Sequence, residues 1–274
     1  MREPEKHPLF QLPQNRQVKI WRFMDFTKFV ALLESRNLFF SRADLLGDPF
    51  EGSISVKAHE LRKAEARRIG REFQGIDTAV VTLAGFGDRL WDSLDADTYM
   101  QRWTSEWMSI SCWHMNEVES AAMWQLYASS GNGVAIQSTY QRLREALPDD
   151  VYIGEVKYIC YKNDNLDLSN SFSPFMSKRE SFSHERELRA IHSSPPSHKR
   201  VNPSTGQEER FSAHDVRNSE AGKSFRVDLN QLVERVHISP LVQHWYADLV
   251  RSVAQKYGLH AEIKQSDLDE KPIF

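Results

Sequence analysis

The first forty residues show two different hydrophobic periods. Residues 18–23 carry apolar and aromatic side chains in a short run that predicts a strand. Asp25 then offers a helix N-cap, and apolar residues recur at helical spacing over 26–33 until Asn37, which can take the left-handed cap conformation. Residues 38–40 return to a strand pattern. The chain is therefore predicted to begin with a strand, a helix and a second strand.

The rest of the chain mixes the same two periods irregularly. Helical spacing of apolar residues predicts further helices over 55–73, 98–108, 121–127, 139–147, 172–182 and 241–257. Alternation, or a short run of β-branched and aromatic residues, predicts strands over 108–113, 134–136, 151–161, 187–192 and 236–238. Because the strands are short and alternate irregularly with helices, we expect an α+β fold, a single domain with a mixed, curved β-sheet flanked by helices.

Composition sets the domain boundaries. Residues 1–17 are rich in charges and prolines and predict an extended leader, whereas 18–268 has the apolar content of one α+β domain. Residues 193–224 are rich in Ser, Pro, Lys and Glu and lack periodicity, which predicts a flexible insertion. Residues 269–274 form a short tail.

Charge and cysteine content exclude several classes. The chain has 274 residues and a net charge of −3, which gives no global field that would attract nucleic acid or an anionic membrane. Its two cysteines, Cys112 and Cys160, form no CxxC pair and stand in no Cys/His cluster, so a structural zinc site is not expected. No secretory signal or long apolar run is present, and we expect a cytoplasmic protein without membrane contact.

The common nucleotide and hydrolase motifs are absent. The segment Ala221-Gly222-Lys223-Ser224 resembles the end of a P-loop, but the first glycine of that motif would fall on Arg217. Gly131-Asn132-Gly133 lacks the third glycine of the dinucleotide fingerprint, since Ile136 stands there. No GxSxG or HExxH sequence occurs.

Two polar features lie on predicted strands. Arg22 interrupts an apolar strand, and it is either an edge residue whose guanidinium reaches solvent or an anion-binding group, because a buried Arg needs a paired anion. Ser109, Ser111 and Trp113 share one face of the next long strand. Ordinary strand patterning and a polar pocket wall both explain that second feature.

A third feature is a pair of carboxylates. Glu185 and Glu187 stand at i and i+2 and would project from one face of an extended segment. Two carboxylates this close can orient a ribose hydroxyl, act as a base or hold a divalent metal. The alternative is an edge-strand ladder in which they pair with Arg186 and Arg189.

An ordered series of motifs resembles a bacterial domain-of-unknown-function family, the one numbered twenty-nine seventy-one. The motifs extend from residue 18 to 268 and are Trp21-Arg22-Phe23, Phe39-Phe40-Ser41, Asp48-Pro49-Phe50-Glu51, Ser111-Cys112-Trp113, Met123-Trp124-Gln125-Leu126-Tyr127-Ala128, Gly133-Val134-Ala135-Ile136, Phe182 with His184-Glu185-Arg186-Glu187-Leu188-Arg189, Val236-His237-Ile238-Ser239-Pro240 and Tyr257-Gly258-Leu259. The resemblance implies an intracellular bacterial or phage-associated protein of a toxin or phage-defence setting.

A second resemblance concerns chemistry. The order Arg22, Ser109 with Ser111, then Glu185 with Glu187 is similar to that of arginine-serine-glutamate ADP-ribosyltransferases. It implies that Arg22 holds the NAD diphosphate, that the serine strand with Trp113 shapes the nicotinamide pocket, that Glu187 binds the nicotinamide-ribose hydroxyl and that Glu185 orients the acceptor. Ile110 departs from that pattern, since the family usually has a small polar residue there.

The leading functional prediction is NAD-using ADP-ribosyl transfer or NAD cleavage, with a nucleotide substrate and an unknown macromolecular acceptor. One alternative is a divalent-metal nuclease, in which the basic helix over 57–71 contacts phosphates and the ligands are Asp48, Glu51, Glu185 and Glu187. Nucleic acid stays open as a partner on that account. Another alternative is a non-catalytic sensor or binding module.

Overall fold

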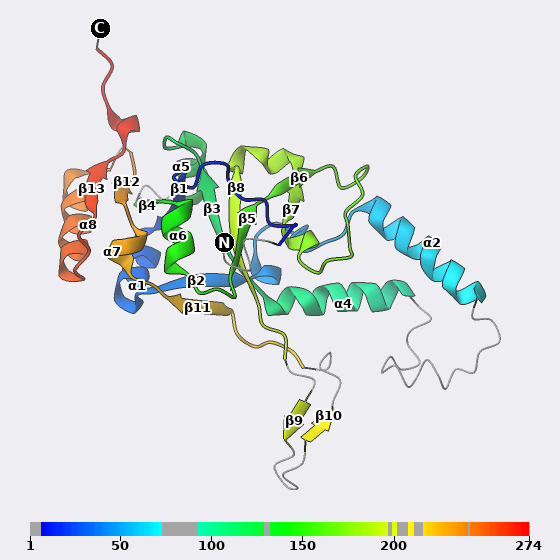
Figure 1. Ribbon diagram of the computed structural model, residues 1–274. Helices are drawn as coiled ribbons and strands as arrows, with labels where there is room; N and C mark the ends of the chain where they lie inside the picture. The colour runs from blue at the N-terminus through cyan, green and yellow to red at the C-terminus, as the bar shows by residue number, and fades with distance from the viewer. Residues whose placement is uncertain are drawn as a thin grey trace.

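The computed structural model of the protein describes residues 7–72, 93–128, 132–196, 199–201, 208–210, 216–240 and 242–273. Helices and strands alternate along these segments and build an α+β domain around one large mixed sheet (Figure 1). The fold class predicted from the hydrophobic pattern is confirmed.

The main sheet has nine strands in the described residues. They are β1 (Lys19–Asp25), β2 (Asn37–Arg42), β3 (Met108–Met115), β4 (Gly133–Thr139), β5 (Tyr152–Glu155), β8 (Glu187–Ser193), β11 (Gly222–Arg226), β12 (Arg235–Ile238) and β13 (Glu262–Gln265). Their main path runs β11-β2-β3-β1-β4-β12-β13, and β8 joins β3 and carries β5. All pairs are antiparallel except β12 with β13, so the sheet is mixed.

Helices pack around this sheet. They are α1 (Phe26–Ser35), α2 (Val56–Glu72), α4 (Ser93–Trp107), α5 (Ala121–Tyr127), α6 (Tyr140–Ala146), α7 (Leu229–Leu232) and α8 (His244–Lys256). Figure 1 shows α8 beside β12 and β13 at one end of the molecule, with α2 and α4 at the other. The largest core cluster joins Ile20, Trp113, Leu188 and Tyr246, which are all nearly inaccessible to solvent.

The predicted strand, helix and strand at the start of the chain are β1, α1 and β2. Asp25 caps α1 by accepting a hydrogen bond from the backbone N–H of Lys28, because that N–H has no partner within the helix. The left-handed cap residue is Arg36, with φ of 52°, and not Asn37, which opens β2. The Arg36 side chain donates to the carbonyl oxygen of Tyr257, which anchors the residue there.

The helix predicted over 172–182 does not form. The chain instead makes a 3₁₀ turn η3 (Ser173–Phe175), the strand β7 (Ser177–Arg179) and a second 3₁₀ turn η4 (Glu180–Glu185). Strand β7 pairs in parallel with β6 (Lys157–Ile159), so a tertiary pairing overrides the local apolar spacing. Lys178 therefore lies on a strand, β7, and not on a helix.

Described residues of the predicted insertion and leader take part in strand pairs and ring contacts. Gly222–Arg226 pairs with β2 as strand β11, and the short strands β9 (Lys199–Val201) and β10 (Glu208–Arg210) pair with each other. Residues 197–198, 202–207 and 211–215 of the insertion lie outside the described part. In the leader, Phe10 is buried and stacks on Tyr152.

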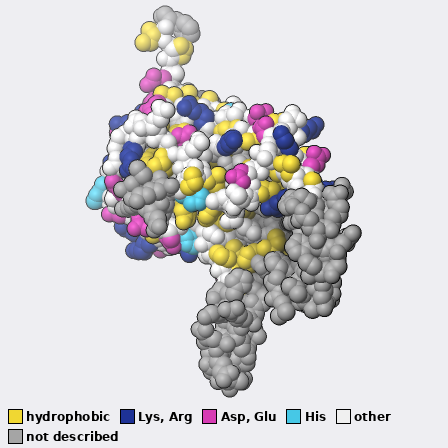
Figure 2. Space-filling model, turned by 45° about the vertical axis from the view of Figure 1, so that its right-hand side comes forward, with side chains coloured by type: hydrophobic (Ala, Val, Ile, Leu, Met, Phe, Trp, Pro, Cys, Tyr) yellow, Lys and Arg dark blue, Asp and Glu magenta, His cyan; other side chains and the backbone are white. Residues whose placement is uncertain are grey.

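The surface carries both charges. On the face in Figure 2, Lys and Arg side chains are interspersed with Asp and Glu, as the net charge of −3 suggests. Among the helices that the structure describes, none combines the length and the apolar character required to cross a membrane.

Candidate functional site

The sheet splits along one edge of β3. On that edge β1 pairs at Ile20 and Trp21, whereas β2 pairs farther along at Ser41 and Arg42. The register leaves residues 111–113 of β3 without a strand partner on this side, since α1 carries the chain from β1 to β2 across the gap. The opposite edge of β3 is fully paired with β8.

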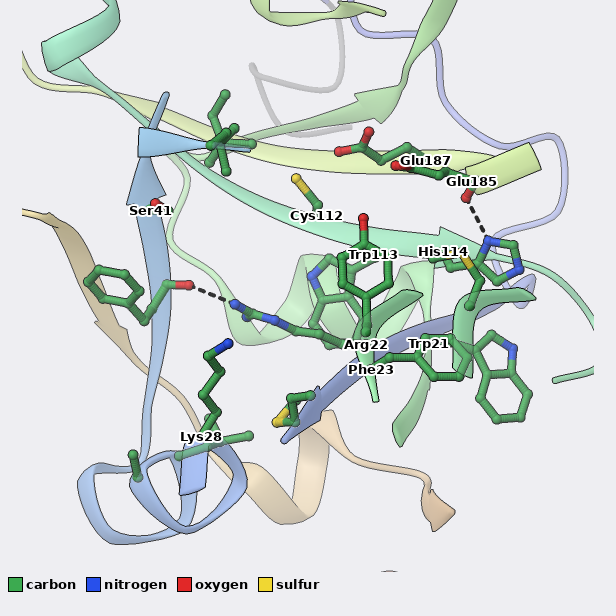
Figure 3. Close-up of a pocket in the computed structure, with 18 of the residues that line it drawn as sticks. Trp21, Arg22, Phe23, Lys28, Ser41, Cys112, Trp113, His114, Glu185 and Glu187 are labelled. Atoms are coloured by element: carbon green, nitrogen blue, oxygen red, sulfur yellow. Dashed lines mark hydrogen bonds between the residues drawn. The ribbon is translucent and has the colours of Figure 1, made fainter. Parts of the chain in front are cut away.

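A pocket of about 690 Å³ opens at this split, a volume typical of small-molecule sites. From β1, β3, α5 and the region of β8 it is lined by Trp21, Phe23, Cys112, His114, Met123, Tyr127, Glu185 and Glu187. From α1, β2 and β11 it is lined by Lys28, Ala31, Leu32, Ser35, Asn37, Phe39, Ser41 and Ser224. Arg22 and Trp113 also line it. In Figure 3, Arg22 and Glu187 lie on different sides of the pocket, with Cys112 and Trp113 between them.

Arg22 reaches from β1 into the gap between the strands. Its Nη1 donates to Ser111 Oγ at 3.1 Å and its Nη2 donates to the carbonyl oxygen of Phe39 at 3.0 Å. Both partners are neutral, and no carboxylate of the described residues forms an ion pair with this guanidinium. Burial lowers the pKa of Arg22 from its usual value. The pocket therefore contains a cation whose charge the described protein groups do not balance.

The serine strand supports Arg22. Ser111 Oγ accepts from both Arg22 and the Trp113 indole, whose Nε1 lies 3.2 Å away, and both β3 residues are fully buried. Residues opposite each other in a ladder share a face, and His114 lies opposite Glu187 while Trp113 lies opposite Leu188. Ser111 and Trp113 thus point to the other face of the sheet from Glu187.

Two residues of β3 differ from the expected arrangement. Ser109 is buried, but it is not among the residues that line the pocket. Cys112 lines the pocket on the face of Glu187, where the resemblance implied a serine. Burial and the neighbouring Glu187 raise the pKa of the Cys112 thiol well above its usual value. Cys112 is therefore a neutral wall of the pocket.

Both predicted carboxylates converge on one lysine. Lys178 Nζ donates to Glu185 Oε2 at 2.6 Å and to Glu187 Oε2 at 3.2 Å, and it lies 3.8 Å from Glu51 Oε1. All four side chains are at least nine-tenths buried. The two glutamates do not share one extended segment, because Glu185 ends η4 and Glu187 begins β8. Between them Arg186 takes a left-handed conformation with φ of 40°.

Arg189 completes the cluster from β8. Its guanidinium is fully buried and binds Glu51 through two hydrogen bonds of 2.6 and 2.8 Å. It binds Glu187 through two more, of 2.8 and 3.1 Å, and its fifth N–H donates to the carbonyl oxygen of Phe175. Burial alone would raise the pKa of Glu187, but Arg189 and then Lys178 lower it to about 2. Glu187 is therefore ionised at neutral pH.

The cations were only partly predicted. Arg189 was expected as a partner of the glutamates and contacts Glu187, whereas Arg186 donates to Asn116 Oδ1 instead. Lys178 was missed because it fell inside the wrongly predicted helix over 172–182. Tyr127, which lines the pocket from α5, was not among the predicted site residues. A lysine seven residues before Glu185 gives no signal until the strand pairing is known.

The four carboxylates of the alternative metal site are close to protein cations. Asp48 accepts from Arg179 Nη2 at 2.7 Å, while Glu51, Glu185 and Glu187 surround Lys178 and Arg189. Across the described ranges, no group of three His, Cys, Asp or Glu residues has the spacing of a metal site. The ammonium of Lys178 lies where the three glutamates meet.

No known family model and no curated protein matches this chain. Solved structures of DarT from Thermus sp. 2.9 are similar to it in arrangement. The complex with NAD+ has a TM-score of 0.41 and 5% sequence identity over 94% of this chain and 100% of that chain. The complex with ADP-ribosylated single-stranded DNA has a TM-score of 0.39 and 5% identity over 94% and 98%. With TM-scores below 0.5, functional assignment has to come from the residues of the pocket itself.

Proposed function

We propose that this protein cleaves NAD and transfers ADP-ribose to water or to a macromolecular acceptor. The observation that supports the proposal most strongly is Arg22, a partly buried guanidinium without an anionic partner in the described residues. It lines the same pocket as the ionised carboxylate of Glu187. A ligand with a phosphate group and a ribose hydroxyl would satisfy both groups.

In this proposal the NAD diphosphate pairs with Arg22, whose guanidinium fork suits two phosphate oxygens. The nicotinamide ribose extends toward Glu187, and the aromatic side chains of Trp21, Phe23 and Tyr127 offer a surface for the nicotinamide ring. The adenosine half extends between α1 and β2, where hydroxyl, amide and aromatic side chains are available. The two sides of the pocket then match the two halves of a dinucleotide.

The chemistry follows from the charge of Glu187. The bond between ribose C1′ and the nicotinamide nitrogen breaks, and the nicotinamide leaves with the bonding electrons as a neutral molecule. Positive charge develops on the ribose, and a carboxylate that accepts a hydrogen bond from a ribose hydroxyl stabilises it most in the transition state. Water or the acceptor, oriented by Glu185, then attacks C1′. The attacking group loses its proton to solvent as the new bond forms.

The decisive experiment compares nicotinamide release from NAD by the wild type and by Glu187→Gln. Because the charge of Glu187 acts chiefly in the transition state, we expect the turnover number to fall about 10²–10³-fold while NAD affinity is retained. Glu180→Gln is the matched control, since Glu180 is exposed at the start of η4, the 3₁₀ turn that precedes β8. Release that is absent from the wild type with protein, RNA and DNA acceptors, or unchanged in Glu187→Gln, would contradict the proposal.

The metal-dependent nuclease is the second candidate, because Glu51, Glu185 and Glu187 lie close together, although the Lys178 ammonium already contacts all three. The same reactions of the three proteins, repeated with a chelator and with labelled single-stranded and double-stranded nucleic acid, separate the two functions. Nucleic-acid cleavage that is lost with the chelator and restored by Mg²⁺ would support the nuclease. Nicotinamide release that the chelator does not change supports NAD cleavage.

From the family resemblance we also propose a toxin or phage-defence role for the protein. Induced expression of the wild type in a bacterial host should arrest growth and lower cellular NAD or modify a macromolecule. Expression of Glu187→Gln at the same level should do neither. Growth arrest by both proteins would separate toxicity from this site.

A further inference from the structure

Lys178 is the one described cation in contact with the Glu185 carboxylate. Arg189 uses all five of its N–H groups on Glu51, Glu187 and the carbonyl oxygen of Phe175. Arg189 therefore has no N–H group left to donate to Glu185, and Lys178 makes that contact. It joins the two glutamates of the pocket through hydrogen bonds of 2.6 and 3.2 Å from one nitrogen.

The backbone places the two bridged glutamates on different elements. Glu185 and Glu187 belong to different elements, and Arg186 between them holds a left-handed conformation that side chains other than glycine adopt at a cost. Lys178 comes from β7, which is held in register by its parallel pairing with β6. A rigid strand thus carries the ammonium to the point where the chain turns between the two acids.

The charge balance leads to the same conclusion. The cluster contains three carboxylates, Glu51, Glu185 and Glu187, and two cations, Lys178 and Arg189. Two carboxylates that share a buried site without a cation between them cannot both stay ionised easily, so one takes up a proton. Burial lowers the pKa of Lys178, but the neighbouring Glu187 and Glu185 raise it above its usual value. The ammonium therefore stays charged at neutral pH.

We propose that Lys178 is a positioning residue, whose ammonium bridges Glu185 and Glu187 and directs both carboxylates at one point of the pocket. This inference rests on the proposed NAD chemistry for its effect on turnover. Lys178 itself is not among the residues that line the pocket, so it acts through the glutamates. Arg22 has separate contacts, with Ser111 and with the carbonyl oxygen of Phe39.

The test compares Lys178→Met, which keeps the chain length and removes the charge, with Lys178→Arg, which keeps a cation. Lys157→Met is the matched control, because Lys157 is exposed on the paired strand β6. We expect Lys178→Met to lower kcat about tenfold or more and to move the acid limb of kcat/KM upward by about 1 pH unit or more, with KM changed little. Lys178→Arg should restore most of kcat, and the control should match the wild type.

A carboxyl titration by ¹³C NMR tests the same inference without substrate. Glu187 should titrate about 1 pH unit or more higher in Lys178→Met than in the wild type, with Glu187→Gln used to assign its signal. A folded Lys178→Met protein with an unchanged Glu187 titration would overturn the inference. If the wild type releases no nicotinamide, the proposed function fails, and this titration alone still decides the role of Lys178.

A second variant is available if Lys178→Met does not fold. If circular dichroism shows that Lys178→Met is unfolded, Lys178→Gln takes its place. If neither folds, the wild-type Lys178 ammonium signal in ¹⁵N NMR decides, because an ammonium bonded to Glu187 must shift as Glu187 titrates. A signal that does not respond to the titration would contradict the bridge.

Discussion

Two arginines in this protein have opposite surroundings, since Arg189 is fully buried among carboxylates and Arg22 is partly buried among neutral groups, and replacing each by methionine gives opposite predictions. Arg189 binds two carboxylates, Glu51 and Glu187, whereas Arg22 binds two neutral oxygens, of Ser111 and Phe39. A buried or partly buried cation without a protein anion beside it is stabilised when a ligand supplies the anion. The Arg22→Met and Arg189→Met variants therefore test whether the pocket binds an anion.

For Arg22→Met we expect little change in the free energy of unfolding. The variant loses two hydrogen bonds, each with a net value of about 1 kcal/mol, and removes the cost of keeping a cation out of water, which acts in the opposite direction. Trp113 still donates to Ser111 Oγ in the variant. The net change should stay within about 1 kcal/mol.

The same substitution should weaken NAD binding strongly. Loss of one partner of a buried, hydrogen-bonded charge pair costs about 2–5 kcal/mol. At about 1.4 kcal/mol per factor of ten, the NAD dissociation constant should rise about 30-fold to several thousandfold. Arg22→Lys should fall between the two proteins, because lysine keeps the charge but loses the two-pronged contact.

For Arg189→Met, unlike Arg22→Met, we expect a large decrease in the free energy of unfolding. The variant leaves Glu51 and Glu187 buried beside a single remaining cation, Lys178, so the free energy of unfolding should fall by about 3–5 kcal/mol. Urea unfolding followed by tryptophan fluorescence measures both variants, and isothermal titration calorimetry measures NAD binding of those that fold. Equal destabilisation by the two substitutions, or NAD affinity unchanged in Arg22→Met, would refute the interpretation of Arg22 as an anion site.

Three further predictions concern stability. At pH values above the ordinary carboxyl pKa of 4.5, the low pKa of Glu187 adds about 3 kcal/mol to the free energy of unfolding, and this contribution is lost as the pH falls toward about 2. Urea unfolding at a series of pH values should show the loss, and the pH dependence should be flatter in Glu187→Gln. Asp25→Ala removes the N-cap of α1 and should cost about 1 kcal/mol, whereas an equal midpoint for the wild type and this variant would contradict the cap. Trp124→Ala should cost about 3–5 kcal/mol, because this indole is buried against Phe23 and donates to Glu119; a loss below 1 kcal/mol would place the ring outside the core.

Local patterns in the sequence were sufficient for most elements near the site. The alternation over 108–113 predicted β3, the apolar run over 18–23 predicted β1, and the cap residue Asp25 with the spacing after it predicted α1. These features depend on backbone groups and side chains within a few residues of each other, so they are present in the sequence itself. The same holds for the chemical types of the site, Arg22, Glu185 and Glu187.

Elements that depend on a distant partner were missed or wrongly predicted. The first three residues of strand β11, 222–224, lie in the segment predicted as a flexible insertion, and they pair with β2. Strand β13 was not predicted, and it pairs in parallel with β12. The segment 172–182 has helical apolar spacing, but its pairing with β6 decides its conformation. Strand pairing is a property of two segments, and one segment does not encode its partner.

Periodicity and residue type alone indicated the fold class and the candidate residues Arg22, Glu185 and Glu187. Strand pairing and packing, in contrast, set the divergence of β1 and β2 along β3, the neutral partners of Arg22 and the bridge from Lys178 to the two glutamates. The cost of a buried charge depends on what lies within a few ångströms of it. Those neighbours come from residues far apart in the chain, so they exist only after the sheet has formed.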